Sequence, residues 1–382
     1  MSNDPSLIAE CGEIRRALRT SATLDSLHAA PSWPALRERI DRVLGTVRRA
    51  VPPLPHDLPS DRDRVRSVHW NIEHGNRYEQ VEHALKTHPQ LAQADLVLLN
   101  EVDLGMARSG NRDVAGDLAQ ALGLHAAWAP LFIETTAGRD EDPHMARDRE
   151  NQEGLFGQAI LSRWPIGGVR VVELPSPSRT QFHFERMYGR HIGLVADIER
   201  PGGPLVAVSV HLAVHGTRAF RAAQMRILLE ELQKEIRPIL IAGDFNSHTF
   251  DRGRPWDPLF GAAVLLLSPG ETLERRLLHP DQGATREPLF DVLRSHGFEW
   301  SRFMDRRPTL RLRFARLPEA RPLLHWAGAP ARRLLSRVER RAGLRLDWFA
   351  GRGWSEGRGA TVHGLDGPAR ASDHAPILAE FG

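Results

Sequence analysis

The feature that most constrains the fold is a series of short apolar segments that begins near Arg64 and continues to the end of the chain. Each segment is about five to nine residues long and rich in β-branched residues, with Gly, Pro or Asp at its ends; they read VRSVHWNI, DLVLLNEV, QAILSRWPI, RHIGLVADIE, PLVAVSVHL, PILIAGDFN, RLDWFAG and DHAPILAEF. Segments of this length and composition are typical of buried β-strands. The sequence therefore predicts that most of the chain is organised around sheets.

Helical patterns lie between some of these predicted strands. The segments TRAFRAAQMRILLEELQKEI, which follows Gly216, and NRDVAGDLAQALG repeat apolar residues at helical spacing. Strands and helices are mixed but do not alternate strictly. This order favours a layered α+β fold over a doubly wound parallel sheet.

The first 60 residues have a different texture. Apolar residues recur at helical spacing in SLIAECGEIRRAL and WPALRERIDRVLGTV, and the turn-rich segment VPPLPHDLPSD follows. We therefore expect an N-terminal helical extension over residues 1–60, followed by one domain over residues 61–382.

A second departure from the strand pattern is an Arg-rich stretch at about 302–345. It contains 13 Arg against Asp305, Glu319 and Glu339, which gives about +10; because the whole chain carries +3, the remainder carries about −7. The segment PARRLLSRVERRAG predicts a basic amphipathic helix. We interpret the stretch as an Arg-rich helical insertion in the domain.

The sequence also bears on location. Cys11 is the only cysteine and cannot form an internal disulfide. The first residues lack the pattern of a secretory signal, and no run of about 18 apolar residues occurs. We expect a cytoplasmic protein without a transmembrane segment.

Polar residues that bind cations or move protons terminate or follow several of the apolar segments. They are Asn71, Glu101, His211, Asp244, Asn246, Asp347, Asp373 and His374. Each alone also fits a structural role, such as a turn, a helix cap or a buried ion pair. As a set they indicate a catalytic site, because sheets hold such groups rigid at accessible strand ends.

The chemistry of this set favours a hard cation. Carboxylates and amides without thiolates suit Mg²⁺ or Mn²⁺. Zinc is the weaker alternative: His211 and His215 are four residues apart, but no glutamate lies between them as in HExxH, and His211 is expected to end a strand.

The motifs WN, NE, HL, GDFN, LD and a terminal SDH, in this order, resemble those of the endonuclease/exonuclease/phosphatase family. The resemblance covers Arg64 to Gly382 outside the Arg-rich insertion, and GDFN and SDH are its most specific parts. It implies a four-layered α/β/β/α sandwich like that of deoxyribonuclease I. One departure is Asn100, where the family usually has Gln before the metal-binding glutamate.

The resemblance also implies how the metal and the phosphate are held. Asn71, Glu101 and Asp373 would form the metal site, with Glu101 as the principal ligand for Mg²⁺ or Mn²⁺. Arg190 is a weaker candidate for a contact with the substrate phosphate. Other weak candidates near the motifs are Glu73, His74, Arg186, Tyr188 and His215.

Catalytic roles follow from the same resemblance. Asp244 and Asn246 would position the attacking water and the scissile phosphate. His374, polarised by Asp347, would transfer a proton or stabilise charge on the phosphoryl oxygens, and His211 would be a second histidine that contacts the phosphate.

The implied activity is divalent-metal-dependent hydrolysis of phosphate esters. We favour a phosphodiesterase that acts on nucleic acid, a nuclease, because the Arg-rich insertion would attract a phosphate backbone independently of its sequence. The alternative is a phospholipid or phosphoinositide phosphodiesterase or phosphatase, because a basic helix equally suits an anionic membrane surface. An inactive phosphate-binding scaffold is disfavoured, since no motif residue is missing, and a serine hydrolase is disfavoured, since GxSxG is absent. Oligomeric state and endo- or exonucleolytic action stay open.

Overall fold

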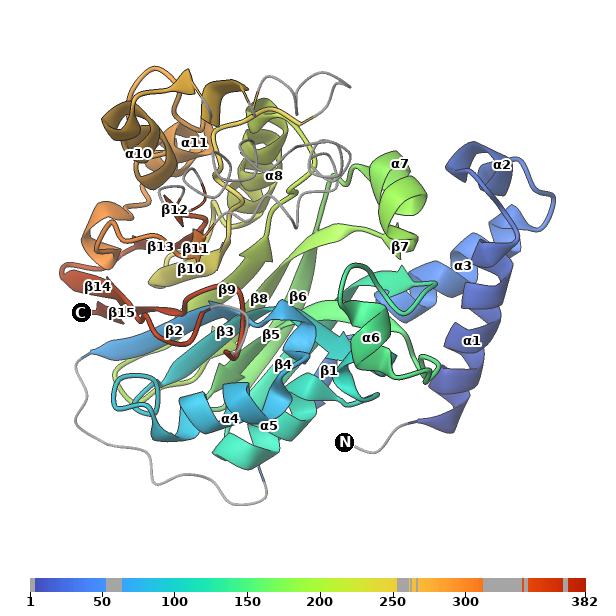
Figure 1. The fold of residues 1–382 in the computed structure, drawn as a ribbon. Coiled ribbons are helices and arrows are strands. Elements are labelled where there is room, and N and C mark those ends of the chain that lie inside the picture. The colour runs from blue at the N-terminus through green and yellow to red at the C-terminus, as the bar shows by residue number, and fades with distance from the viewer. Residues whose placement is uncertain are drawn as a thin grey trace.

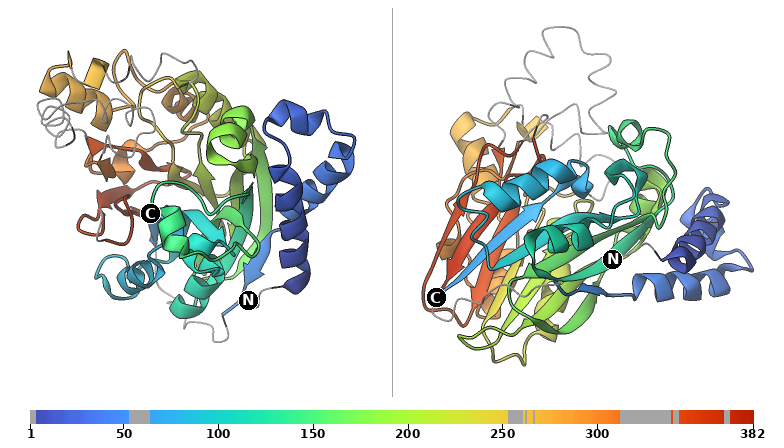
Figure 2. Two further views of the ribbon diagram at one scale, coloured as in Figure 1. Left: turned by 45° about the vertical axis from the view of Figure 1, so that its right-hand side comes forward. Right: turned by 90° about the horizontal axis from the view of Figure 1, so that it is seen from below.

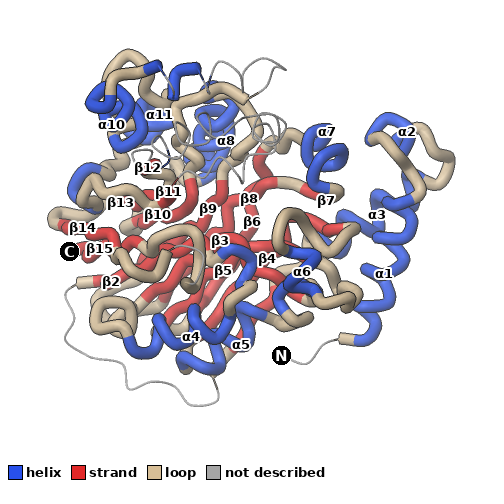
Figure 3. Tube along the Cα trace, in the orientation of Figure 1, coloured by secondary structure: helices blue, strands red, loops and turns tan. Residues whose placement is uncertain are grey.

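A computed structural model of the chain describes residues 4–52, 64–252, 261, 263–265, 267–311, 339, 343–366 and 370–382. Two large sheets occupy the centre of the described molecule (Figures 1 and 3). In spatial order, the eight-stranded sheet contains β1 (Arg48–Ala50), β4 (His125–Glu134), β5 (Leu155–Ser162), β3 (Leu96–Leu104), β2 (Val65–Asn71), β15 (Ile377–Phe381) and β14 (Gly357–Thr361), and β7 (Met187–Gly189) pairs with β4. The five-stranded sheet contains β13 (Asp347–Arg352), β10 (Ile239–Asp244), β9 (Leu205–His211), β8 (His191–Ile198) and β6 (Ile166–Leu174).

The two sheets pack face to face, because their central strands are apolar on both sides. Successive side chains of a strand point to opposite faces. In β3, Leu98 lies in the core between the sheets and Leu99 lies in the core on the outer face of the eight-stranded sheet. In β10, Leu240 faces the same central core, while Ile241 belongs to the core outside the five-stranded sheet. This alternation explains why the strand segments read as continuous apolar runs.

Helices cover the outer face of each sheet (Figures 1 and 2). Val81 of α4 (Tyr78–Thr87) and Leu118 of α5 (Val114–Leu122) belong to the outer core of the eight-stranded sheet. Met225 of α8 (Arg218–Glu231) and Phe290 of α11 (Leu289–Ser295) belong to the outer core of the five-stranded sheet. The helix α10 (Gly270–Leu278) lies on the same side of the molecule. The expected four-layered α/β/β/α sandwich is thus confirmed.

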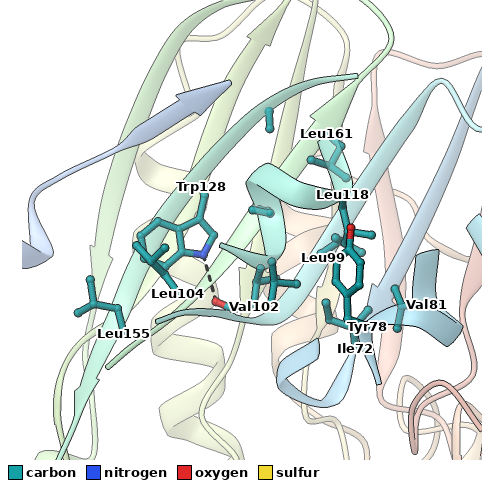
Figure 4. Packing of buried hydrophobic residues seen from close by; sticks show 14 of the residues in the cluster. Ile72, Tyr78, Val81, Leu99, Val102, Leu104, Leu118, Trp128, Leu155 and Leu161 are labelled. Atoms are coloured by element: carbon teal, nitrogen blue, oxygen red, sulfur yellow. Dashed lines mark hydrogen bonds between the residues drawn. The ribbon is translucent and has the colours of Figure 1, made fainter. Parts of the chain in front are cut away.

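Figure 4 shows part of the outer core of the eight-stranded sheet. Trp128 of β4 lies beside Leu104 and Leu155, which come from the strands β3 and β5. Its indole Nε1 donates a hydrogen bond of 3.1 Å to the carbonyl oxygen of Val102. The bond satisfies the one polar atom of a buried tryptophan, as expected for an indole in a core. Trp128 is therefore a core residue.

Three helices fall within the predicted N-terminal extension: α1 (Pro5–Arg19), α2 (Leu24–His28) and α3 (Trp33–Leu44). Ile14 and Ile40 are buried in the same core as α4 and α5. The strand β1 follows and pairs with β4, so this part of the chain also adds an edge strand to the sheet. A domain boundary at residue 60 stays a prediction, since residues 53–63 lie outside the described ranges.

Most of the Arg-rich stretch, including the helix predicted for PARRLLSRVERRAG, lies outside the described residues. Its two ends are described, and they form the short antiparallel strands β11 (Leu310–Arg311) and β12 (Gly343–Leu344), which pair with each other. Leu310 and Arg311 thus lie beside Leu344 and Gly343. Across the described ranges, the structure contains no helix of the length and apolarity needed to span a membrane.

Candidate active site

The register of the five-stranded sheet brings three of the predicted residues together. Asp244 is the last residue of β10 and lies opposite His211, the last residue of the parallel strand β9. It also lies opposite Asp347, the first residue of the antiparallel strand β13. The expectation that Asp347 terminates its apolar segment is therefore wrong, because Asp347 begins its strand. Since β13 runs antiparallel, its start reaches the same edge of the sheet as the ends of β9 and β10.

Glu101 reaches this edge through an irregularity in β3. Its pairing with β5 shifts register between Asn100 and Val102, which marks a β-bulge, and Glu101 has a left-handed backbone with φ of 55°. Such a conformation costs a non-glycine residue about 1–3 kcal/mol and persists where its surroundings impose it. Bulges re-aim side chains beside active sites. The Glu101 side chain accepts a 2.9 Å hydrogen bond at Oε1 from Nδ2 of Asn71, at the end of β2.

Asn100, beside Glu101, connects the two sheets. It is fully buried, and its Oδ1 accepts a 2.8 Å hydrogen bond from the backbone N–H of Asp244. Its Nδ2 donates to Gln158 of β5 at 3.3 Å and to Ser209 of β9 at 3.2 Å. The asparagine that stands where the family usually has glutamine therefore fixes the position of Asp244 relative to β3.

The third part of the site is a histidine–aspartate pair. His374 donates from Nδ1 to Oδ2 of Asp347 across 2.8 Å, and both side chains are buried. Burial alone would lower the pKa of His374, but the negative charge of Asp347 and this hydrogen bond outweigh it and raise the pKa well above its usual value. The contact with Asp347 therefore favours the protonated form of His374.

Asp347 has a second imidazole partner that the sequence did not reveal. Nε2 of His69, on β2, lies 3.0 Å from Oδ1 of Asp347. His69 is inside an apolar segment and was not among the predicted residues. A signal was present, because His69 and Asn71 are two residues apart and therefore share one face of their strand.

Asp244 lies between two histidines. Its Oδ2 is 3.7 Å from Nε2 of His211 and 3.8 Å from Nε2 of His374. Burial lowers the pKa of His211, so this imidazole is neutral where that of His374 is charged. Side-chain oxygen and nitrogen atoms of Asp244, Asp347 and His374 all lie within 4.8 Å of one another.

Asn246 is fixed by backbone contacts. Its backbone has φ of 48°, its N–H donates to Oδ1 of Asp244 at 2.8 Å, and its Nδ2 donates to the carbonyl oxygen of Leu212 at 2.8 Å. The GDFN segment thus forms a tight, strained turn that places Asn246 directly beside Asp244.

Glu101 lies in an environment that disfavours its ionisation. Burial, and then the negative charge of Asp373, raises the pKa of Glu101 to about 8. The negative charge of Asp373 also acts on His374. A carboxyl group whose ionisation a neighbouring carboxylate disfavours forms, together with that neighbour, a suitable set of oxygen donors for a cation.

Two of the weaker candidates contact predicted site residues: the backbone N–H of Glu73 donates to Oδ1 of Asn71 at 3.2 Å, and the His74 ring reaches Glu101. Nε2 of His74 lies 3.5 Å from Oε2 of Glu101. Burial, and then the positive charge of Arg108, lowers the pKa of His74 to about 3, so the ring is neutral. His215 is paired with Glu185 at 3.0 Å. The geometry therefore does not support a zinc site shared by His211 and His215.

The remaining weak candidates have other partners. Arg190 bonds to the carbonyl oxygen of Leu44 and to Glu173, so its guanidinium is engaged with α3 and β6. The geometry therefore does not support the predicted contact between Arg190 and the substrate phosphate. Tyr188 packs its ring against Trp33 of α3. Glu73 pairs with Arg77, and Arg186 lies over the ring of Phe182.

A buried ion cluster supports the loops behind His74. Arg108 is 3% exposed and binds Asp103 at 2.8 Å, Glu134 at 2.8 Å and Asp142 at 3.2 Å. These carboxylates come from β3, β4 and α6 (Asp142–Ala146). No pattern in the sequence indicates this cluster, because its members are common surface residue types.

Fold and site together define a layered α+β protein with a buried centre of carboxylates and histidines at one edge of two packed sheets. The family model described as "Endonuclease/Exonuclease/phosphatase family" matches residues 68–374, and the chain belongs to this family. Members of this family are in general hydrolases of phosphoric esters.

Solved structures of similar fold share little sequence with the chain. An endonuclease/exonuclease/phosphatase from Beutenbergia cavernae DSM 12333 is 18% identical, with coverage of 84% of this chain and 72% of that chain and a TM-score of 0.49. One from Bacteroides vulgatus is 15% identical, with coverage of 84% and 99% and a TM-score of 0.48. The human Nocturnin catalytic domain with bound sulfate is 15% identical, with coverage of 86% and 99% and a TM-score of 0.44. No curated protein matches the chain.

Proposed function

We propose that the chain is a divalent-metal-dependent phosphodiesterase that hydrolyses nucleic acid. The observation that carries the proposal is the convergence of Glu101, Asp244, Asp347 and His374 from four strands or strand ends onto one edge of the sandwich. Their residue types match the needs of phosphate-ester hydrolysis, which are cation binding, proton handling and a fixed approach of water to phosphorus.

The residues fit a hard cation such as Mg²⁺ or Mn²⁺. Glu101 and Asp373 supply carboxylate oxygens in an environment where burial and mutual repulsion raise the pKa of Glu101 to about 8. Asn71 would contribute by orienting Glu101, because its amide nitrogen faces that carboxylate. A cation bound there would neutralise negative charge on the phosphoryl oxygens.

The two histidines suit opposite roles. His374 is protonated, and its Nδ1–H is held by Asp347, so Nε2 would present a charged donor to a phosphoryl oxygen or to the leaving group. His211 is neutral and would bind the phosphate by hydrogen bonding. Pairs of titratable groups whose environments separate their pKa values are typical of acid–base sites. Asp244, held by Asn100 and flanked by both rings, would accept the proton of the attacking water, and Asn246 would orient the phosphate.

Nucleic acid is the proposed substrate because of the Arg-rich stretch, whose net charge of about +10 would attract a phosphate backbone. A cytoplasmic location likewise stays a prediction from the sequence. The proposed substrate and the predicted location both rest on the sequence alone.

The test is an activity panel in Mg²⁺, Mn²⁺ or EDTA with plasmid DNA, single-stranded RNA, sphingomyelin vesicles and inositol phosphates. We expect metal-dependent cleavage of the nucleic acids that is lost in Glu101→Ala and His374→Ala. Turnover retained in both variants would remove the site assignment. Turnover of sphingomyelin or inositol phosphates alone would replace nucleic acid with a lipid or inositol substrate.

A further inference from the structure

His69 is a buried residue with polar partners on both sides of its ring. It is 0% exposed and lies in β2, which pairs with β3 on one side and with β15 on the other. Its Nδ1 lies 3.1 Å from the carbonyl oxygen of Leu98, and its Nε2 lies 3.0 Å from Oδ1 of Asp347. Both oxygens are hydrogen-bond acceptors that an imidazole N–H can satisfy. His69 is thus fixed to the sheet at one nitrogen and to Asp347 at the other.

The two oxygens of Asp347 are therefore divided between two imidazoles. Oδ1 accepts from His69, and Oδ2 accepts from Nδ1 of His374. The terminal torsion of an aspartate is broad and roughly two-fold, so one hydrogen bond alone fixes it poorly. A second bond on the other oxygen fixes the plane of the carboxylate. The plane of the carboxylate in turn sets the orientation of the His374 ring, whose Nδ1 bonds to Oδ2.

The position of His69 makes this contact independent of the site loops. His69 lies opposite Ile377 of β15 and Leu98 of β3 in the sheet register. It reaches Asp347, at the start of β13, from the other sheet. The hydrogen bond therefore fixes Asp347 against the centre of the eight-stranded sheet, whereas His374 lies in the segment just before β15.

We propose that His69 is a positioning residue for the reaction: it holds the Asp347 carboxylate in the orientation that aligns His374 with the substrate. The catalytic consequence rests on the proposed function of the same site. The alignment itself does not depend on turnover, and this difference makes the two proposals separable by experiment.

The substitutions follow from the geometry. His69→Leu removes both ring nitrogens and replaces the ring with an apolar side chain of similar bulk. His69→Gln retains a side-chain amide that can donate near the place of Nε2. The matched control is Ser67→Ala, because Ser67 lies two residues earlier on the same face of β2 and its buried hydroxyl has no hydrogen-bond partner among the residues that the structure describes.

The first measurement is the proton NMR resonance of the His374 Nδ1–H in the full chain labelled with ¹⁵N-histidine, assigned by its loss in His374→Ala. We expect a far-downfield signal in the wild type, in Ser67→Ala and in His69→Gln. In His69→Leu the signal should be shifted or broadened by exchange. An unchanged signal in His69→Leu would overturn the proposal.

The second measurement is steady-state hydrolysis of bis(p-nitrophenyl) phosphate and of plasmid DNA in Mg²⁺. We expect kcat to fall about 10–100-fold in His69→Leu with little change in KM, as for removal of residues that orient catalytic ligands. His69→Gln should recover most of the loss. Equal kcat losses in His69→Leu and His69→Gln, with the NMR signal intact, would assign His69 a structural role only. A wild type inactive on every substrate would contradict the proposed function while the NMR result still decides the positioning role.

Discussion

Nδ1 of His374 and Oδ2 of Asp347 are 2.8 Å apart; Asp347 begins β13 of the five-stranded sheet, and His374 lies in the segment before β15 of the eight-stranded sheet. The pair exists only when both sheets are packed, so its chemistry reports directly on the assembled fold. It is also the contact on which the proposed protonation of His374 depends.

Replacing Asp347 by Asn should therefore reduce turnover strongly. Asparagine keeps the size of the side chain but removes the negative charge that stabilises the imidazolium, and its amide favours a different ring tautomer. We expect kcat to fall by about 10²–10⁴-fold with a small change in KM. Steady-state kinetics on the preferred substrate of the panel measures this.

Asp291→Asn is the matched control for that substitution, because Asp291 is a partly exposed residue paired with Arg286 outside the site. It should retain full activity. Wild-type kcat in Asp347→Asn would exclude a catalytic function for the His374–Asp347 pair.

The raised pKa of Glu101 predicts a pH dependence of stability in the metal-free protein. Burial, and then Asp373, raises this pKa to about 8 from an ordinary value of 4.5. Between these values the unfolded chain loses its proton while the folded chain keeps it. The stabilising contribution is thus complete below pH 4.5 and is lost as pH rises through about 8. Urea unfolding in EDTA at pH 5, 6.5 and 8 should show this decline, and Glu101→Gln should reduce it.

The same proton should leave when a cation binds. A protonated carboxyl cannot ligate Mg²⁺, so binding at pH 7 requires Glu101 to ionise. We expect about one proton to be released per cation bound at pH 7, and fewer at pH 9. Calorimetric titration with Mg²⁺ in two buffers of different ionisation enthalpy measures this number. Undiminished proton release in Glu101→Gln would show that another group supplies the proton.

Asn100 links the sheets next to the site, and its removal should weaken both the fold and the reaction. Asn100→Leu leaves the buried N–H of Asp244 and the groups of Gln158 and Ser209 with one partner fewer each. An unsatisfied buried polar group costs about 1–3 kcal/mol. We expect a loss of free energy of unfolding in this range or above, measured by urea unfolding, together with a lower kcat because Asp244 is no longer held.

Asn100→Gln provides the comparison for Asn100→Leu, since glutamine keeps a side-chain amide and is the residue that the family usually has at this position. It should recover activity better than Asn100→Leu. Equal activity in the two variants would contradict the idea that the amide positions Asp244.

The strands and the four layers could be predicted from the sequence because the hydrophobic pattern is local. The segment PILIAGDFN shows both the buried strand β10 and the polar residues at its end. Pairing across long separations leaves no such mark: His69 shares a strand face with Asn71, but no local pattern indicates that it pairs with Asp347, 278 positions away. The bulge at Glu101 is likewise set by packing between strands. Asp347 was placed on the wrong end of its strand because strand direction is a property of the sheet.

The Arg108 cluster is a further feature that only the fold reveals, and it carries a prediction about stability. Arg108 neutralises Asp103, Glu134 and Asp142 in a buried environment. Burial raises the pKa of Asp103, and burial raises that of Glu134 to about 7, even with the guanidinium present. Removing the cation leaves these carboxylates without compensation, which typically costs about 3–5 kcal/mol.

Arg108→Ala should therefore lower the free energy of unfolding by about this amount at pH 7, as measured by urea unfolding, and by less at pH 5, where the carboxyl groups take up protons more readily. The matched control is Arg112→Ala: Arg112 is 39% exposed and pairs with Glu79 on the surface, so its loss should cost about 1 kcal/mol or less.

Because the cluster joins β3, β4 and α6 beside His74, Arg108→Ala should also lower activity under conditions where the variant remains folded. A cost in Arg108→Ala no greater than in Arg112→Ala would mean that the buried carboxyl groups are neutral in the folded protein and that Arg108 is not needed to balance them.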